Sequence, residues 1–536
     1  MERHMSKLNS RAKSERASRE IGESMNGNVQ FKKSSITQLF ELVVSTLYGK
    51  DSFYESANDK VVRAREAMDK VLAEHGEQGA EYIGRVIIFA RTKMNMRTMP
   101  IVMAVELAAA LYRQNIKWPG LRGVVAGVIN RADELNDMFA YAEKVFDANK
   151  QEGGKGRIPR QVLNGIGDAF NKFDLYQFGK YNDTSKDKTF KKVINVVHPT
   201  PLDKDQSDIF ARIVNNDVPS PYTWEVVKTQ NGMLPEAERK SEAEVWTELV
   251  TRKGSGSMGY MAMLRNLRNI GNAGVTNELI NFVAERISNP VEVQRSKQLP
   301  WGFINAHAEA LKAGLPTRLE LAVADAAGLA LGNMPSIGKK VWIILDCSGS
   351  MGRFSSYAYD PKRNDDNSPI KIGAIFAAAL FKAAQNSDCV ALSMFSDKAE
   401  LVRLEPKDSI MTMYQKIMAK VYGGGTNLQA ALEQKSQLGF EPDTVVVLSD
   451  MEVNGLTGNS YHWDQPKKAP VNVAKLFDKD AVLVAVNLNS SQTTPLDPRD
   501  GWIQLSGWSE AIFRYVDFTR RGDSVAMKLF NGELVD

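Results

Sequence analysis

The residues best suited to chemistry follow an apolar run, Val341–Leu345, that predicts a buried β-strand. Asp346, Ser348 and Ser350 come directly after this run and place one carboxylate and two hydroxyl groups on a single loop. Ligands of open parallel sheets bind beyond the carboxyl ends of the strands. We therefore expect a binding site here, and the alternative is that Asp346 and Ser348 only cap the next helix.

Two more oxygen groups occupy comparable positions farther along the chain. Thr426 follows three glycines in GGGT, and Asp450 closes the strand-like run DTVVVLSD. Oxygen ligands without histidine or cysteine suit Mg²⁺ or Mn²⁺ rather than zinc. We expect one divalent cation, Mg²⁺ with Mn²⁺ as the alternative, held by Asp346, Ser348, Ser350, Thr426 and Asp450. Such an ion could bind a partner's oxygen atom, or it could only hold the loops in place.

The spacing of apolar residues divides the chain into two regions, and the elements that position the expected ligands lie in the second. From Lys339 onward, strand-like runs that are apolar along their whole length alternate with helical patterns, which predicts a Rossmann-like parallel sheet covered by helices on both faces. Before that point the periodicity is helical, and short turns between the helices favour a stack of HEAT-like hairpins. The expected regions are a flexible basic tail at 1–28, a helical domain at 29–337 and an α/β domain at 338–536.

Composition limits the classes of function. The net charge is only +4, so any nucleic-acid surface must be a local patch. The only cysteines, Cys347 and Cys389, exclude a disulfide-dense scaffold, predict buried free thiols and favour a cytoplasmic location. No run approaches the roughly 18 apolar residues of a membrane helix, so no membrane partner is expected. No catalytic constellation is recognisable, and a single-ion site lacks the second metal and the general base of a nuclease, so we do not expect an enzyme.

Basic residues beside amides and aromatic rings in the helical region suit the binding of nucleic acid. Cations pair with phosphates and rings stack on unpaired bases, although a solvated helix face with core aromatics explains the same pattern. Arg265 and Arg268, in MLRNLRN, are expected to share one helix face. With Lys297 and Arg97 they form our candidate set of nucleic-acid contacts, which the resemblance described next would assign to a central cavity.

At this point the chain resembles the Ro RNA-binding proteins, which join a TROVE module to a von Willebrand factor A domain. The resemblance covers about residues 29–534, and the set DCSGS, GGGT and LSD resembles the metal-ion-dependent adhesion site of such A domains. The helical segments that carry it are GYMAMLRNLRNI (259–270), RSKQLPWGFINA (295–306), GRIPRQVLNGI (156–166), GKYN (179–182) and FKKVINVVHPTP (190–201).

The resemblance implies a closed ring of helical repeats that binds RNA without catalysis. Single-stranded 3′ ends of misfolded noncoding RNAs would enter the central hole, and Y-like RNA would bind the outer face. Exoribonucleases such as polynucleotide phosphorylase would act with the protein in RNA quality control, decay or rRNA maturation. The expected protein is a monomer with RNA partners, rRNA precursors among them, and without DNA.

The family's outer RNA contacts fall, by motif position, on Lys180 and His198, to which we add Lys191 and Lys192. Relatives carry an arginine three residues before that histidine, whereas this chain has Asn195, so the outer contact is expected to be weaker or differently tuned. A rival hypothesis makes the protein a metal-dependent adhesion module, in which the A domain recruits a partner protein and the helices are only a scaffold.

Overall fold

A computed structural model of the chain describes residues 21–23, 29–32, 34–45, 57–148, 157–182, 189–254, 256–334, 337–355, 358–360, 368–384, 389–453, 473–488, 493–497, 500–506 and 525–533. The chain divides into two compact units, one of residues 1–70 with 335–536 and one of residues 71–334. Within the described ranges, no helix combines the length and apolar character needed to cross a membrane.

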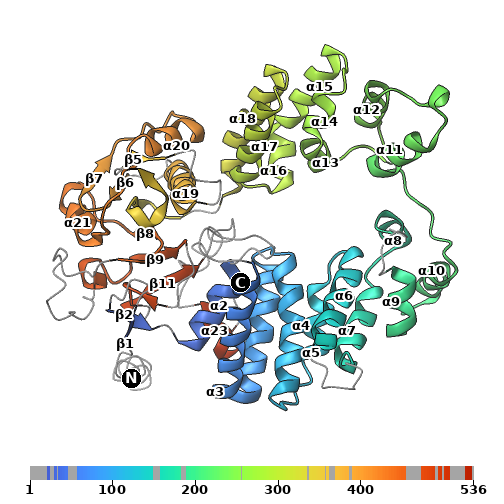
Figure 1. Cartoon of the computed structure of the whole chain (residues 1–536), viewed down its shortest axis with the longest axis horizontal. Helices are drawn as coiled ribbons and strands as arrows, with labels where there is room; N and C mark the ends of the chain where they lie inside the picture. Colours follow the sequence, from blue (N-terminus) through green and yellow to red (C-terminus); the bar gives the residue numbers. More distant parts are fainter. Residues whose placement is uncertain are drawn as a thin grey trace, which may run out of the picture. The chain divides into compact units, whose positions relative to one another are not determined.

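The second unit is built from helices, as the sequence predicts (Figure 1). Its elements are α3 (Ala57–Thr92), which begins in the first unit, α4 (Thr98–Arg113), α5 (Leu121–Val128), α6 (Asp133–Ala148), α7 (Arg160–Phe170), α8 (Leu175–Lys180), α9 (Phe190–Val197), α10 (Lys204–Asn215), α11 (Trp224–Met233), α12 (Glu242–Thr251), α13 (Tyr260–Arg265), α14 (Leu267–Gly271), α15 (Asn277–Ile287), α16 (Pro290–Ser296), α17 (Pro300–Lys312) and α18 (Thr317–Leu329).

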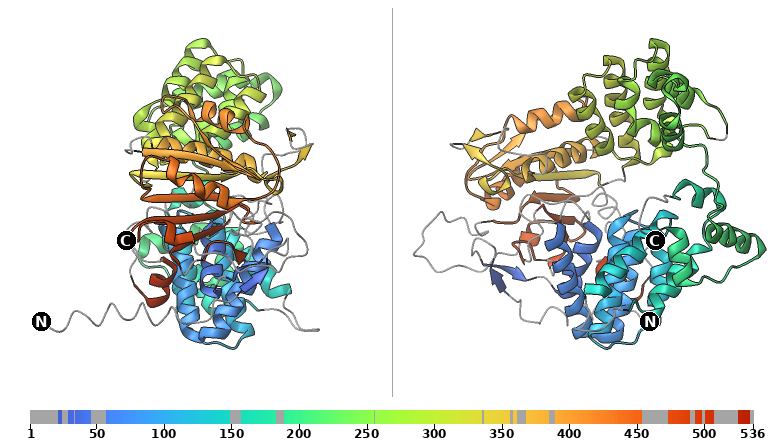
Figure 2. Two further views of the ribbon diagram at one scale, coloured as in Figure 1. Left: turned by 90° about the vertical axis from the view of Figure 1, so that its left-hand side faces the viewer. Right: turned by 45° about the vertical axis from the view of Figure 1, so that its right-hand side comes forward.

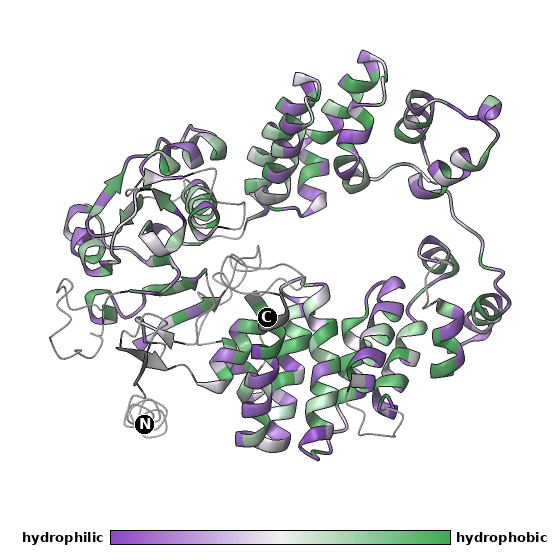
Figure 3. Cartoon of the chain, in the orientation of Figure 1, coloured by the Kyte–Doolittle hydropathy of each residue, from purple (hydrophilic) through white to green (hydrophobic). Residues whose placement is uncertain are grey.

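Helix α4 is the most deeply buried part of this unit. Every residue from Met99 to Leu111 is buried, and Figure 3 shows the hydrophobic character of this helix. It packs against α5 and α6, while α5 packs in turn against α7 and α17 against α18. The consecutive pairs α4–α5 and α17–α18 are helical hairpins of the kind that short turns predict, whereas α4–α6 and α5–α7 pack helices that are not consecutive.

An aromatic cluster joins α7, α8, α9 and α10. Phe178 of α8 stacks on Phe170 at 5.8 Å between ring centroids and meets Phe190 of α9 edge to face at 5.2 Å. Phe210 of α10 meets Phe170 edge to face at 5.9 Å. Because Phe170, Phe178 and Phe190 are all fully buried, these rings fix the helices that carry the expected outer RNA contacts.

The first unit contains the α/β domain. Its elements are β1 (Ile21–Glu23), β2 (Val29–Lys32), α2 (Ser35–Ser45), β3 (Lys340–Asp346), β4 (Phe354–Ser355), β5 (Ala358–Tyr359), α19 (Pro369–Ala383), β6 (Cys389–Phe395), β7 (Ala399–Val402), α20 (Ile410–Met418), α21 (Leu428–Glu433), β8 (Thr444–Ser449), β9 (Val482–Asn487), β10 (Thr493–Thr494), β11 (Trp502–Ser506) and α23 (Val525–Asn531).

Six of these strands form one sheet in the order β11-β9-β8-β3-β6-β7, which Figure 2 shows from two sides. The first five pair in parallel, but the edge strand β7 runs antiparallel to β6, so the sheet is mixed and the expected purely parallel sheet is wrong at this edge. Trp342 and Ile344 of β3 pack with α21 on one face, whereas Leu345 lies close to Gly373 of α19 on the other. Helices therefore cover both faces.

The N-terminal part of the chain differs from the expectation. Strand β2 pairs antiparallel with β1 on one side and with β10 on the other, and α2 packs against β11 and α23. The first residues of the helical domain expected at 29–337, up to residue 70, thus belong to the unit that contains the α/β domain. The tail expected at 1–28 contains strand β1, and its first 20 residues lie outside the described part.

Gly123 of α5 and Gly165 of α7 give a matched test of how closely these two helices pack. A Cβ atom at Gly165 would lie 2.7 Å from both the Arg122 carbonyl oxygen and the Val125 Cβ, whereas one at Gly123 would meet nothing within 4 Å. Gly165→Ala should lower the free energy of unfolding by roughly 1–3 kcal/mol, because the two helices must separate. Gly123→Ala should leave it unchanged or raise it by about 0.5–1 kcal/mol. Urea unfolding of both variants measures the difference, and equal effects would contradict the close packing.

Candidate functional site

Three loops at the carboxyl end of the sheet carry the expected metal ligands. Strand β3 ends at Asp346, which is fully buried, and the next loop begins with the fully buried Ser348. The Gly349 amide donates to the Gly424 carbonyl at 3.0 Å, which joins this loop to the glycine-rich loop of Thr426. The third loop follows β8, and the sheet therefore brings three distant segments together as predicted.

The Asp346 carboxylate is held by two donors. The Ser348 amide donates to Oδ1 at 2.8 Å, and the Ser449 hydroxyl donates to Oδ2 at 2.6 Å. Burial, followed by the charge of Asp450, raises the pKa of the Asp346 carboxyl to about 7, despite the lowering effect of these hydrogen bonds. Its ionised form is therefore under-compensated by the protein alone.

Asp450 is also buried, and only one of its oxygens has an assigned donor. Its Oδ1 accepts from the Glu452 amide at 3.1 Å, and the Ser350 side chain also hydrogen-bonds to this carboxyl group. Its Oδ2 is buried without a hydrogen-bond partner among the described residues. Burial raises the pKa of Asp450 to about 6. This oxygen is therefore available to a group outside the chain.

The hydroxyl groups complete the constellation. The Ser348 and Ser350 hydroxyl oxygens lie 3.2 Å apart, and Thr426 is 6% exposed. The Thr426 loop is fixed by the Asn427 amide, which donates to the Ser396 carbonyl at 2.8 Å, and by the Gly425 amide, which donates to the Asp397 carboxylate at 2.8 Å. Four of the five predicted residues are thus linked by hydrogen bonds or by charge, and Thr426 lies on the adjoining loop.

This donor set fits a hard divalent cation. Two buried carboxylates would supply its counter-charge, and the hydroxyl groups of Ser348, Ser350 and Thr426 would supply neutral oxygen ligands. Nowhere in the described ranges do three side chains of histidine, cysteine, aspartate or glutamate gather in a metal-binding arrangement. A metal site here would therefore need the hydroxyl groups as well as the two carboxylates.

One residue beside the site has a strained backbone. Met451 directly follows Asp450 and adopts a left-handed conformation with φ of 61°. Its side chain is fully buried, and its amide donates to the Ser449 hydroxyl at 2.9 Å. A left-handed conformation costs a residue with a Cβ atom roughly 1–2 kcal/mol. The buried core and this hydrogen bond hold the turn that aims Asp450 into the site.

The expected outer RNA contacts lie at the ends of α8 and α9. Lys180 is the last residue of α8 and is exposed, and its ammonium group lies 5.5 Å from the centroid of the Tyr181 ring. His198 is exposed and ends α9 in a left-handed conformation. The loop after it is held by Asn171, whose side chain donates to the Thr200 carbonyl at 2.9 Å.

The two lysines added from sequence lie at the other end of α9. Lys191 and Lys192 are in its first turn, about 10 Å along the helix axis from His198 at 1.5 Å per residue. Lys192 and Asn195 are exposed and three positions apart on the helix, so they share a face. The outer set is therefore spread along α9 rather than gathered at one point.

The candidate cavity residues are exposed, but one detail of their placement differs. The helix that the sequence predicts through MLRNLRN is interrupted at Asn266, so Arg265 ends α13 and Arg268 belongs to α14. Asn266 is buried and its side chain donates to the Ala262 carbonyl at 2.9 Å. Lys297 ends α16 in a left-handed conformation with φ of 53°. The single helix face expected for Arg265 and Arg268 is thus divided between two short helices.

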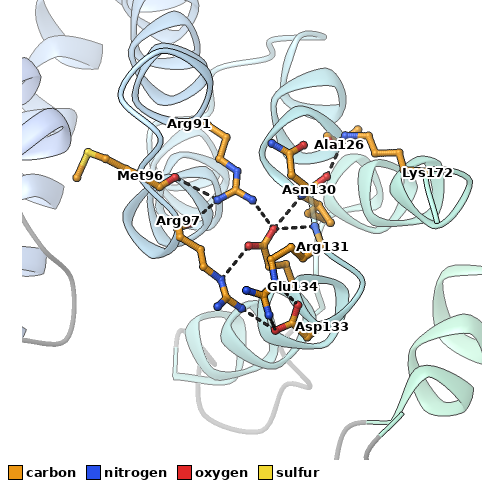
Figure 4. A network of polar contacts seen from close by, with 10 residues as sticks. Arg91, Met96, Arg97, Ala126, Asn130, Arg131, Asp133, Glu134 and Lys172 are labelled. Carbon is orange, nitrogen blue, oxygen red and sulfur yellow. Dashed lines mark hydrogen bonds and ion pairs between the residues drawn. The ribbon is translucent and has the colours of Figure 1, made fainter. Parts of the chain in front are cut away.

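Arg97 has a different role from the one expected. Its Nε donates to Glu134 at 3.0 Å, and its Nη2 donates to Asp133 at 2.6 Å (Figure 4). Burial alone would lower the pKa of the Arg97 guanidinium, but these two carboxylates outweigh it and raise that pKa. Because the charge of Arg97 is met within the fold, we remove it from the set proposed to bind RNA.

The ion network around Glu134 is a feature that the sequence did not reveal. Glu134 is fully buried and accepts from Arg91 Nη2 at 2.5 Å as well as from Arg97. The amides of Asn130 and Arg131 donate to the same carboxylate at 2.9 and 3.1 Å (Figure 4). The sequence shows only that arginine and glutamate occur in helical segments that are expected to pack together, and this does not indicate which residues form pairs.

Comparison with known proteins identifies two domains. A family model described as TROVE domain matches residues 216–325, and one described as von Willebrand factor type A domain matches residues 341–452. Telomerase protein component 1 of Mus musculus and that of Rattus norvegicus are each 34% identical over 87 residues, which is 16% of this chain and 3% of each relative. The similarity is thus confined to a short segment of this chain and to a small part of those proteins.

A solved structure has the same fold over nearly the whole chain. The Ro (RSR) protein of Deinococcus radiodurans matches with a TM-score of 0.58 and 19% sequence identity, covering 94% of this chain and 100% of that one. The two domains also occur here in the order that the sequence predicts. A helical region followed by an α/β A domain is thus confirmed as the architecture.

The two buried carboxylates make a testable prediction about stability. Without a divalent cation, the pKa values of Asp346 and Asp450 are higher in the folded protein than in the unfolded chain. The contribution of these two groups to the free energy of unfolding is therefore greatest below about pH 4 and is lost as the pH rises through about 6 to 7. At pH 7 in EDTA, Asp450→Asn removes one of the two buried carboxylates, so its free energy of unfolding should be roughly 1–3 kcal/mol higher than that of the parent chain. Mg²⁺ should raise the midpoint temperature of the parent chain and not that of Asp450→Asn.

Thermal unfolding with and without Mg²⁺ measures both effects. Glu433→Gln removes an exposed carboxylate of α21 in the same unit and should change neither the stability in EDTA nor the response to Mg²⁺. If Asp450→Asn destabilises the metal-free protein, the carboxylates are compensated within the chain and the metal site is not supported.

Proposed function

We propose that this chain, which joins a TROVE domain to a von Willebrand factor A domain in the fold of a Ro protein, binds RNA without catalysis. The observation that carries the proposal is the combination of both domain matches with a common fold over nearly the whole chain. The exposed cations Lys180, Arg265, Arg268 and Lys297 lie in the helical unit and supply charge for phosphate contacts.

Two RNA surfaces belong to this proposal. The helices close into a ring whose central cavity takes the single-stranded 3′ ends of misfolded noncoding RNAs, through Arg265, Arg268 and Lys297. Lys180, His198, Lys191 and Lys192 bind a structured, Y-like RNA on the outer face. The aromatic cluster of Phe170, Phe178 and Phe190 supports the outer site, because it fixes α8 and α9 against each other.

The metal site has a separate place in the proposal. A bound Mg²⁺ would supply positive charge and an open position for an oxygen ligand, and Asp346, Ser348, Ser350, Thr426 and Asp450 would hold it. The unpartnered Asp450 Oδ2 supports this role. It also favours the second candidate function, in which the A domain captures an acidic group of a partner protein such as an exoribonuclease. Asp346→Ala should then abolish partner capture and leave RNA affinity intact.

The two RNA surfaces should separate by mutation. Lys180→Ala combined with His198→Ala should weaken binding of a blunt-ended structured RNA about tenfold or more, because two phosphate contacts are lost, while a single-stranded 3′-tailed RNA still binds. Arg265→Ala combined with Arg268→Ala should have the opposite pattern. Filter binding at several salt concentrations measures both, and each pair should reduce the salt slope for its own RNA by about one to two.

A matched pair elsewhere in the helical unit controls for charge. His75→Ala combined with Lys117→Ala removes one histidine and one exposed lysine outside both surfaces and should bind both RNAs as the parent chain does. If the parent chain binds neither RNA, the proposed function is wrong. If the Lys180/His198 pair loses neither RNA, the outer surface is misplaced.

A further inference from the structure

A ring and two cations meet directly beside the proposed outer RNA site. Tyr181, the residue after α8, is half-buried, and the Arg131 guanidinium carbon lies over its ring at 4.8 Å from the centroid. The Lys180 ammonium lies 5.5 Å from the same centroid. Arg131 precedes α6, so two segments that are distant in sequence build this cluster.

Arg131 is held in place before any ligand binds. Its Nε and Nη2 donate to the two Asp133 oxygens, each at 3.0 Å, and its backbone amide donates to the buried Glu134. Asp133 Oδ2, which accepts from Arg131, also accepts from Arg97 Nη2 at 2.6 Å, so a second arginine holds the same carboxylate. One edge of the guanidinium is thus occupied, while Nη1 makes no hydrogen bond within the described ranges and the side chain is 36% exposed.

The surroundings have an excess of positive charge. Arg91, Arg97 and Arg131 share two carboxylates, Asp133 and Glu134, and Lys180 adds a further cation beside Tyr181. Burial, and then the nearby Arg91, lowers the pKa of Lys172, which donates to the Ile129 carbonyl at 3.0 Å. A negatively charged ligand is therefore favoured on this surface.

We infer that Arg131, lying over Tyr181 and oriented by Asp133, is a stacking platform for an unpaired RNA base, whose neighbouring phosphate is contacted by Lys180. The inference rests on the proposed RNA-binding function and adds Arg131 and Tyr181 to it as ligand-contacting residues, with Asp133 as a positioning residue. A guanidinium is planar and stacks on π systems as well as pairing with anions.

A base fits this platform better than a protein carboxylate does. The edge of Arg131 that binds carboxylates in two-point fashion is already filled by Asp133. A second carboxylate there would meet the like charge of the first. The Arg131 guanidinium already lies over Tyr181 on one side, so a base would stack on the opposite side, which leaves the bonds to Asp133 intact.

The test uses a blunt-ended RNA stem–loop with 2-aminopurine in its loop. This probe has no single-stranded 3′ tail, so it does not report on the cavity, and stacking of the 2-aminopurine base quenches its fluorescence. The full chain should bind it with quenching. Arg131→Lys keeps the charge but removes the planar group, and it should lose the quenching and about tenfold in affinity at an unchanged salt slope.

Three further variants separate stacking from charge. Tyr181→Phe keeps the ring and should behave as the parent chain, whereas Tyr181→Ala should resemble Arg131→Lys. Lys180→Ala should reduce the salt slope by about one and keep the quenching. Asp133→Asn should weaken the quenching more than the affinity, because it loosens the orientation of Arg131 without removing a cation.

Arg122→Lys is the matched control. Arg122 forms the same two-point pair, with Asp168 at 2.6 and 2.7 Å, is exposed, and has no ring contact within the described ranges. This variant should leave both quenching and affinity unchanged. Equal behaviour of Arg131→Lys and Arg122→Lys overturns the platform. If the parent chain does not bind the probe while the 3′-tailed RNA binds, the outer site and the platform fail together, and if neither RNA binds, the proposed function itself fails.

Discussion

Burying a carboxylate costs free energy unless donors or positive charge meet it, and this constraint organises both units of the protein. In the helical unit, Glu134 is fully buried and accepts from two arginine side chains and two backbone amides. These partners come from the end of α3, the start of α4 and the start of α6. A single buried charge therefore holds three helical segments in register.

The α/β unit meets the same constraint only in part. Asp346 has a hydroxyl and an amide donor, whereas Asp450 keeps one buried oxygen without a partner in the described structure, and the two carboxylates repel each other. The strained turn at Met451 maintains this arrangement although a relaxed turn would cost less. The contrast separates a closed structural network from a site in which one buried carboxylate oxygen lacks a partner among the described residues. It is the physical reason for assigning a binding role to the second and a positioning role to the first.

The sequence predicts which oxygen-bearing residues the fold brings to the carboxyl end of the sheet, because a local pattern marks the place of each, whereas their binding of a metal stays a prediction. Asp346 follows an apolar run and Thr426 follows a glycine run, so no knowledge of distant contacts is needed. The ion pairs of Arg97 could not be predicted, because its partners Asp133 and Glu134 lie 36 and 37 residues away and no local pattern indicates the pairing. The pairing of β2 with β10 could not be predicted for the same reason, since the two strands lie near opposite ends of the chain. The break at Asn266 was missed because periodicity reports which positions are apolar and not where a buried amide interrupts the helix.

Two kinds of contact set the geometry of the proposed outer RNA surface: close packing around α8 and the buried ion network of Glu134. Helix α8 is fixed on one side by Phe178 in the aromatic cluster, and on the other by Gly179, where a Cβ atom would lie 2.3 Å from the Pro219 carbonyl oxygen. Lys180 and Tyr181 follow directly, so their backbone positions are set by packing and not by the ligand. Arg131 reaches the same ring from the Glu134 network. A binding residue that is positioned by buried contacts loses little conformational freedom when its ligand arrives, and so more of the stacking free energy remains as affinity.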